Sequence, residues 1–268
     1  MCIILTCEKN VRPNYDLIED CFWNNPDGAG IMWCEDGRVQ TSKGFSTPQS
    51  LFAAIESVPM ESRLVVHMRI ATSGGIDVGT CHPFPICNDL DILHEPDVEC
   101  SAAIAHNGII SDMPTDKNLG ISDTISFVLT VVNDLYVDAG YKMTKSVRRR
   151  IKNAALGNRF ALMTSDGEVY RLGVGWQTVT KGIHASNGSW RYTALTGRMA
   201  DSWDKWSDDD YYDWWEDNDA SGGKYDEAFD TCCGDCACRG TCMAYGPTCE
   251  GVAEYINWYM DEQERLTA

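Results

Sequence analysis

The sequence has no long apolar segment and no excess of positive charge. No run approaches the roughly 20 apolar residues that a membrane-spanning helix needs, so we expect no membrane contact. Lysine and arginine together number 22 against 40 aspartates and glutamates, which gives a net charge of −18. Binding to a nucleic-acid backbone needs clustered cations, and we therefore expect no direct contact with DNA or RNA.

The first residues show no secretory leader. The apolar run CIILTC at 2–7 is too short for a signal-peptide core, and no basic segment precedes it. A short apolar run that ends in polar residues is typical of a buried strand. Thirteen cysteines without a leader indicate reduced thiols, so we expect a cytoplasmic protein without a disulfide framework.

The negative charge is concentrated at the end of the chain. Residues 1–200 hold 22 acidic and 18 basic residues, whereas residues 201–268 hold 18 acidic and 4 basic ones. The sequence therefore predicts a near-neutral domain at 2–200, an acidic, aromatic-rich linker at 201–231 and a cysteine-rich tail with a closing helix at 232–268.

The last two segments leave alternatives open. Nine acidic and six aromatic residues at 201–219 fit a solvated linker, an extension that packs back on the domain, or a docking segment for a basic, apolar partner surface. Thiolates at short spacings can hold zinc, but two well-separated CxxC pairs are missing. A metal site and reduced, loosely structured thiols therefore both remain open for Cys232, Cys233, Cys236, Cys238, Cys242 and Cys249.

The pattern of 2–200 is mixed. Apolar periodicity and caps predict helices at 14–23, 46–58, 123–140 and 145–156. Turn residues at 35–37 and 165–167 predict two hairpins, and the apolar runs 63–69 and 101–110 predict strands. Several hairpins with few βαβ alternations favour an α+β fold whose sheets are mainly antiparallel.

The second residue carries candidate chemistry. If Met1 is removed, Cys2 has a free α-amine beside its thiol. A thiol reacts as thiolate, and an adjacent base can take its proton. The α-amine has a reference pKa of about 7.7–8.0, so one residue can supply both nucleophile and base at neutral pH.

Six short motifs occur in one order and connect this cysteine with other residues. They are Cys2, NPDGAG at 25–30, HMRIATSG at 67–74, CHPFP at 81–85, AHNGI at 105–109 and SDT at 122–124. Their order and spacing resemble those of class II glutamine amidotransferases, which belong to the N-terminal-nucleophile hydrolases, over roughly residues 2–200. The resemblance implies a four-layer αββα sandwich with two mainly antiparallel sheets.

The resemblance also implies roles for single residues. Cys2 would attack the side-chain amide of glutamine, while the Asn107 amide and the Gly108 N–H would stabilise the oxyanion. Such a donor contributes about 10²–10³ in rate. Arg69 would grip the α-carboxylate of glutamine, for which a planar guanidinium is well shaped, and Asp123 would hold its α-ammonium.

Further residues receive supporting roles. Thr72 and Gly74 lie in the loop that would close over glutamine. We interpret His67, His82 and His106 as packing or supporting residues rather than bases.

The implied function is a glutaminase half-reaction that yields glutamate and ammonia from L-glutamine without a cofactor and without a metal. We expect no phosphate loop and no sizeable second domain from this sequence, so the ammonia acceptor is expected either on a partner protein or to be absent. Two alternatives stay open: a catalytically silent amino-acid-binding module, and an amidohydrolase acting on another γ-glutamyl-type amide.

Deletion of residues 201–268 tests the docking interpretation of the acidic, aromatic segment. We expect the shortened chain to hydrolyse glutamine as before but to lose its partner in a pull-down. Unchanged activity together with unchanged partner recovery would rule out a docking role.

Overall fold

The computed structural model describes residues 2–70 and 78–191. The strands are β1 Ile3–Cys7, β2 Ala29–Glu35, β3 Arg38–Phe45, β4 Leu64–Met68, β5 Phe84–Pro85, β6 Asp97–Cys100, β7 Ala102–Asn107, β8 Arg159–Thr164, β9 Val169–Leu172, β10 Gln177–Thr180 and β11 Ile183–Ala185. The helices are α1 Tyr15–Asn24, α2 Pro48–Ser57, α3 Leu90–His94, α4 Asp123–Phe127, α5 Asn133–Asp138 and α6 Lys145–Ala154. Short helical turns lie at η1 Val78–Thr80 and η3 Gly188–Arg191, and a π-helical stretch, η2, covers Val128–Val132.

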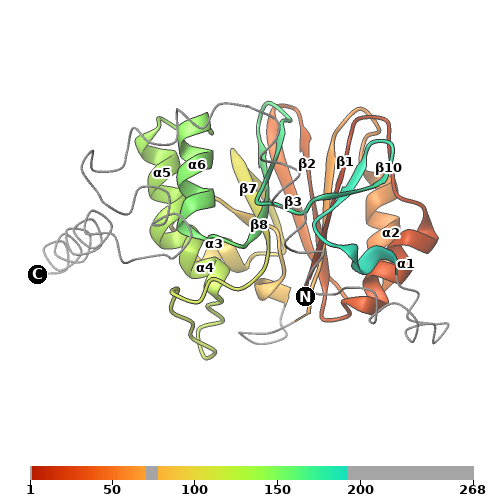
Figure 1. The fold of residues 1–268 in the computed structure, drawn as a ribbon, viewed down its shortest axis with the longest axis horizontal. Helices are drawn as coiled ribbons and strands as arrows, with labels where there is room; N and C mark the ends of the chain where they lie inside the picture. The colour runs from red at the N-terminus through yellow and green to blue at the C-terminus, as the bar shows by residue number, and fades with distance from the viewer. Residues whose placement is uncertain (1, 71–77, 192–268) are drawn as a thin grey trace, which may run out of the picture. The chain divides into compact units, whose positions relative to one another are not determined.

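The strands form two sheets (Figure 1). One has the order β10-β11-β1-β4-β2-β3-β6, and the other has the order β5-β7-β8-β9. Every strand pair in the described residues is antiparallel. The prediction of a mixed α+β fold with two mainly antiparallel sheets is confirmed.

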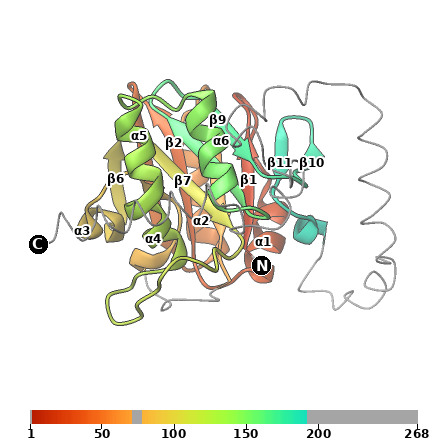
Figure 2. The ribbon, with the colours of Figure 1, turned by 60° about the vertical axis from the view of Figure 1, so that its left-hand side comes forward.

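Three apolar clusters show how the sheets and helices pack. The first lies between the seven-stranded sheet and helices α1 and α2, and the second between the four-stranded sheet and helices α4 to α6. Figure 2 shows α5 and α6 over the sheet that contains β7. The third cluster joins the two sheets and consists of Ile4, Met32, Val39, Val65, Ala103, Ala105, Ala161 and Met163.

The alternation of side chains along the strands assigns each residue to a face. In β1, Ile3 and Leu5 belong to the cluster under α1 and α2, whereas Ile4 belongs to the cluster between the sheets. In β7, Ala103 and Ala105 likewise lie between the sheets. Because successive side chains of a strand point to opposite faces, the residues that continue these rows also face the space between the sheets.

Local sequence signals explain where the predicted helices begin. The side chains of Asn14, Thr47, Ser122 and Thr144 each accept a backbone N–H of the following turn. Such caps satisfy donors that a helix start leaves without partners. The hairpins predicted around 35–37 and 165–167 are confirmed as β2–β3 and β8–β9.

The helix predicted at 123–140 is continuous from Asp123 to Asp138, but it contains a π-helical stretch, η2, between α4 and α5. The hydroxyl of Thr130 donates to the carbonyl of Ser126 at 2.7 Å, a local side-chain bond that apolar periodicity does not record. The segment between the strands β5 and β7 also contains α3 and β6, which the apolar pattern does not predict.

Some expectations fall on residues that the structure does not describe. They are the linker at 201–231, the tail at 232–268 with its cysteines, and the loop residues Thr72 and Gly74. Among the residues that are described, no helix has the length and apolar character to cross a membrane.

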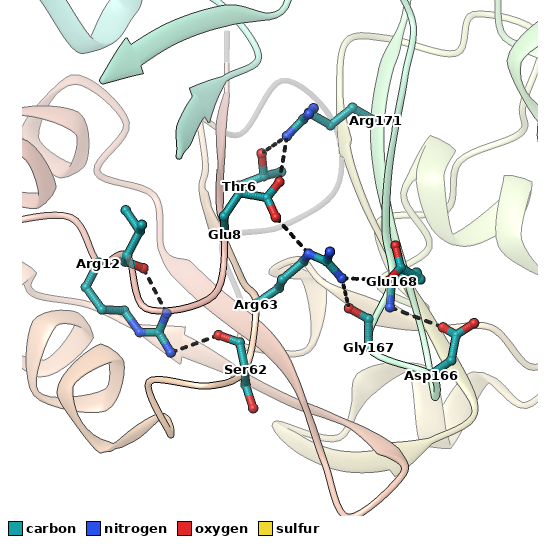
Figure 3. A network of polar contacts seen from close by, with 10 residues as sticks. Thr6, Glu8, Arg12, Ser62, Arg63, Asp166, Gly167, Glu168 and Arg171 are labelled. Carbon is teal, nitrogen blue, oxygen red and sulfur yellow. Dashed lines mark hydrogen bonds and ion pairs between the residues drawn. The ribbon is translucent and has the colours of Figure 1, made fainter. Parts of the chain in front are cut away.

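An ion-pair network centred on Arg63 connects the two sheets (Figure 3). The Arg63 guanidinium donates to Glu8 at 2.8 Å, just beyond β1, and to Glu168 at 2.9 Å, just before β9. It also donates to the carbonyl of Gly167 at 3.0 Å. Arg171 adds a 3.7 Å pair with Glu8. The network lies where β1 ends and β4 begins, at the opposite end of these strands from Cys2.

Replacing Arg63 by alanine should lower the free energy of unfolding by about 1 kcal/mol, because partly exposed ion pairs contribute about 0.2–1 kcal/mol each. Urea unfolding measures this change. Arg38→Ala is the matched control, since its pair with Glu99 is more exposed and lies within one sheet. An Arg63→Ala protein no less stable than the Arg38→Ala protein would show that the network does not join the sheets energetically.

Candidate active site

The pairing of β1 with β4 brings Cys2 and Arg69 to one edge of the larger sheet. Ile3 lies opposite Met68 in this antiparallel pair, so the residues one step further on each strand, Cys2 and Arg69, are neighbours. Both continue the row of side chains that faces the space between the sheets. Arg69 is 4% exposed, and its guanidinium is therefore held inside the protein.

The NPDGAG motif supports the backbone of Arg69. The N–H of Asp27 donates to the Arg69 carbonyl at 3.0 Å, and the Arg69 N–H donates to the Gly28 carbonyl at 2.9 Å. At Gly30, in the same motif, the backbone leaves no room for a side chain, because a Cβ there would lie 2.2 Å from the carbonyl oxygen of His82. The motif thus fixes the arginine and the CHPFP segment through close backbone contacts.

A second support reaches the Arg69 side chain. Its guanidinium donates to the hydroxyl of Thr80 at 2.9 Å. Thr80 belongs to η1, which Lys43 holds in place by donating to the carbonyls of Gly79 at 2.9 Å and Leu93 at 2.5 Å. Neither Thr80 nor Lys43 is predicted from the sequence, because neither residue type is unusual on a strand or in a loop.

Asn107 and Gly108 end strand β7 on the other sheet. Asn107 is 1% exposed, and its Nδ2 lies 2.8 Å from the hydroxyl oxygen of Ser186. Gly108 has a φ of +148°, and a Cβ there would lie 1.9 Å from Oδ1 of Asn158. Only glycine fits this position, which explains the glycine of the AHNGI motif.

Asp123 lies at the start of α4, directly after the capping Ser122. One carboxylate oxygen accepts the Ile110 N–H at 2.8 Å, and the other accepts the Thr124 N–H at 2.8 Å. The carboxylate therefore holds the turn that follows Gly108. The oxygen bonded to the Thr124 N–H also accepts the Thr124 hydroxyl at 3.3 Å, whereas the oxygen bonded to Ile110 has a further acceptor position with which Asp123 can bind a cation.

A small pocket joins these segments. Its lining consists of Cys2, Arg69, Ile70, Thr80, His82, His106, Gly108, Ser122, Asp123 and Thr124. Four of the seven predicted site residues, Cys2, Arg69, Gly108 and Asp123, are therefore brought together. Asn107 lies directly beside the pocket in sequence but does not line it, and Thr72 and Gly74 are outside the described residues.

The pocket has a volume of about 20 Å³, which is about the room that one water molecule needs. An amino acid needs more room than this.

Burial keeps the Cys2 sulfur in its thiol form. Burial raises the pKa of the Cys2 thiol, and the positive charge of Arg69 opposes that rise only in part. The thiol donates to the carbonyl of Ile70 at 3.5 Å. The Cys2 thiol is therefore not a preformed thiolate, and a reaction at this sulfur would require a proton acceptor.

Three buried histidines lie next to one another beside the pocket. Nε2 of His67 lies 3.0 Å from the carbonyl oxygen of His106 and 2.9 Å from Nδ1 of His82. Because a carbonyl can only accept, Nε2 of His67 carries the hydrogen. Nδ1 of His82 is then an acceptor, and the hydrogen of the His82 ring lies on its Nε2. His106 is held by Thr124 and Asn158, each at 2.7 Å.

The three imidazoles are neutral at physiological pH. Burial lowers the pKa of His67 to about 3, and burial likewise lowers the pKa values of His82 and His106. Within the described residues, none of them hydrogen-bonds the Cys2 sulfur. Their placement agrees with a packing and supporting role.

In the described part of the chain, no group of three or more histidines, cysteines or acidic residues is placed to hold a metal ion. The described cysteines, Cys2, Cys7, Cys21, Cys34, Cys81, Cys87 and Cys100, are free thiols.

Comparisons with known proteins find similar solved structures but no family. No family model matches the chain, and no curated protein matches it. A similar solved structure is the glutamine phosphoribosylpyrophosphate amidotransferase from B. subtilis in complex with ADP and GMP, at 16% sequence identity and a TM-score of 0.40. The similarity covers 69% of this chain and 41% of that one, so this chain corresponds to less than half of the larger protein.

Acid should destabilise the fold through the histidines. Their folded pKa values lie below the unfolded value of about 6.5, so the unfolded chain binds more protons as the pH falls through that value. The contribution of the neutral histidines to the free energy of unfolding is fully present above about pH 6.5. At lower pH the free energy of unfolding should decrease by up to about 1.4 kcal/mol per pH unit for each histidine.

Urea unfolding at pH 7.5, 6.5 and 5.5 measures this dependence. His82→Gln should reduce the slope, because one titrating imidazole is removed. A stability that stays constant between pH 7.5 and 5.5 would contradict the burial of neutral histidines.

Proposed function

We propose that this protein hydrolyses the side-chain amide of L-glutamine, with Cys2 as nucleophile, and so performs the ammonia-producing half-reaction of a glutamine amidotransferase. The observation that carries the proposal is the shared pocket of Cys2, Arg69, Gly108 and Asp123, which come from four separate segments. A nucleophile, a cation, a backbone donor and an anion are the groups that this reaction needs.

The α-amine of Cys2 is the proposed base. The reaction requires removal of Met1, after which the amine and the thiol belong to one residue. Burial keeps the thiol protonated, and it lowers the pKa values of the nearby histidines, which makes them weak bases. The α-amine, which belongs to the same residue as the thiol, is therefore the proposed proton acceptor. The sulfur then forms a bond to the amide carbon of glutamine.

The tetrahedral intermediate carries its negative charge on the former amide oxygen. The N–H of Gly108 and the amide of Asn107 would donate to this oxygen. The ammonium of Cys2 returns its proton to the leaving nitrogen, so ammonia departs and a thioester remains. Water then attacks the thioester, which releases glutamate and restores the thiol.

Arg69 and Asp123 would select an amino acid as substrate. Both are almost fully buried, so the charges of a zwitterionic ligand would meet little competing water. Thr80 fixes the guanidinium, and two backbone N–H groups fix the carboxylate.

The finer parts of the proposal concern the architecture and the residues beyond the pocket. We place the two helix-covered sheets in the αββα sandwich of N-terminal-nucleophile hydrolases, because the three apolar clusters separate four layers. Thr72 and Gly74 would close over glutamine. A partner protein would supply the ammonia acceptor, and residues 201–268 would contact it.

Kinetics of the full chain with glutamine tests the proposal. Glutamate and ammonia should form in equal amounts, and Cys2→Ala should abolish both. Arg69→Lys should raise KM about tenfold or more, which corresponds to about 1.4 kcal/mol, because an ammonium cannot make the paired bonds of a guanidinium to a carboxylate. Arg38→Lys is the control, since Arg38 is an exposed strand residue away from the pocket.

Mass spectrometry after treatment with a glutamine-analogue electrophile completes the experiment. We expect a chain that has lost Met1 and carries the label on Cys2. A chain that retains Met1 and binds glutamine without turnover would support a silent binding module instead. Turnover of other γ-glutamyl amides but not of glutamine would assign a different amidohydrolase.

A further inference from the structure

Ser186 connects the strand that begins beside Cys2 with the proposed oxyanion site. Its hydroxyl oxygen accepts the N–H of Ile4 at 2.9 Å, and its own N–H donates to the Ile4 carbonyl at 2.9 Å. The same hydroxyl lies 2.8 Å from the amide of Asn107 on the opposite sheet. Ser186 is fully buried, so none of these bonds competes with water.

The neighbouring residue strengthens this connection. Asn187 donates from its side chain to the carbonyl of Cys2 at 2.8 Å. Ser186 and Asn187 directly follow β11, which pairs with β1 through Leu5 and Ala185. One short segment therefore positions both Cys2 and Asn107.

The hydrogen bonds of Asn107 are incomplete in one orientation of its amide. With Nδ2 toward Ser186, Oδ1 is buried and has no hydrogen-bond partner in the described residues. The Ser186 oxygen then accepts two N–H groups, and its own O–H has no acceptor among the bonds described. Two polar groups remain unsatisfied, and each buried one costs about 1–3 kcal/mol.

A rotation of the Asn107 side-chain amide by 180° exchanges the positions of Oδ1 and Nδ2. Ser186 then donates its O–H to Oδ1 and accepts the Ile4 N–H, so its donor and its acceptor are both used. Among residues 2–70 and 78–191, the group then left without a partner is the NH₂ of Asn107. An unpaired donor at this position is what a developing oxyanion requires.

We propose that Ser186 is a positioning residue that fixes the amide of Asn107 with its NH₂ directed to the oxyanion of the reaction. This inference rests on the proposed function, because it assigns Asn107 to the oxyanion site. Ser186 does not touch the substrate and acts only through Asn107. Without the serine hydroxyl, the amide can turn its oxygen toward the oxyanion and repel it.

Ser186→Ala in the full chain should lower kcat for glutamine about tenfold to hundredfold, since misplacing a catalytic group by about 1 Å has effects of that size. KM should change less than threefold, because Arg69 and Asp123 bind the substrate. Ser62→Ala is the matched control: it removes a serine hydroxyl bonded to a strand carbonyl, that of Cys34, at the other end of the sheet. The control should retain kcat.

A double-mutant cycle separates positioning from general damage to the fold. If Ser186 acts through Asn107, Ser186→Ala should lower kcat no further in an Asn107→Ala background. An equal loss in both backgrounds, or a wild-type kcat in Ser186→Ala, would overturn the inference while glutaminase activity of the wild type still stands.

Neutron diffraction from crystals of the full chain gives a readout without turnover. We expect the Ser186 hydroxyl deuterium to point at Oδ1 of Asn107, with both amide deuteriums directed away from the serine. An amide deuterium on the line to the Ser186 oxygen would overturn the inference. If the wild type does not hydrolyse glutamine, the proposed function fails, and this measurement still decides the orientation of the amide.

Discussion

The antiparallel pairing of β1 with β4 is the constraint on which the site depends. Its register puts Ile3 opposite Met68 and therefore Cys2 beside Arg69. A slip of β1 by one residue against β4 would turn each of the two rows of β1 side chains to the opposite face of the sheet. It would also move Ile4 out of the cluster between the sheets, so core packing and site geometry are fixed together. The register of β1 and β4 therefore places Cys2, and Asn187 adds a hydrogen bond to its carbonyl at 2.8 Å.

The contact between the sheets then determines what can face Cys2. Three alanines, Ala103, Ala105 and Ala161, lie in the cluster between the sheets, where small side chains let two sheets approach closely. That approach brings the end of β7 within hydrogen-bonding reach of Ser186, which is bonded to β1. The opposite end of β1 is linked to the other sheet by Arg63. Contacts at both ends of the strand thus hold the two sheets in one relative position.

The sequence predicts the elements whose signals are local and misses those set by partners distant in the chain. Caps and turn residues mark the helix starts and both hairpins, and the six motifs identify the four residues that meet in the pocket. No local pattern marks Ser186, because its bonds to Ile4 and Asn107 span 182 and 79 residues. The same reason hides Thr80 and Lys43, whose polar contacts form only after the chain has folded.

Leaving buried polar atoms unpaired costs stability, and the described residues carry this cost at Asn107 Oδ1 and also at Nδ1 of His67 and Nε2 of His82. Around Arg69 and Asp123, backbone N–H groups and Thr80 supply partners, so both charges are supported before any ligand arrives. At Asn107, by contrast, one amide atom is buried without a partner in the described residues. Buried charges that already have hydrogen-bond partners are suited to binding a ligand in its ground state. A buried polar group without a partner is tolerated where that partner, an oxyanion, forms only during the reaction. This difference separates the groups that would hold glutamine from the group that would act on it.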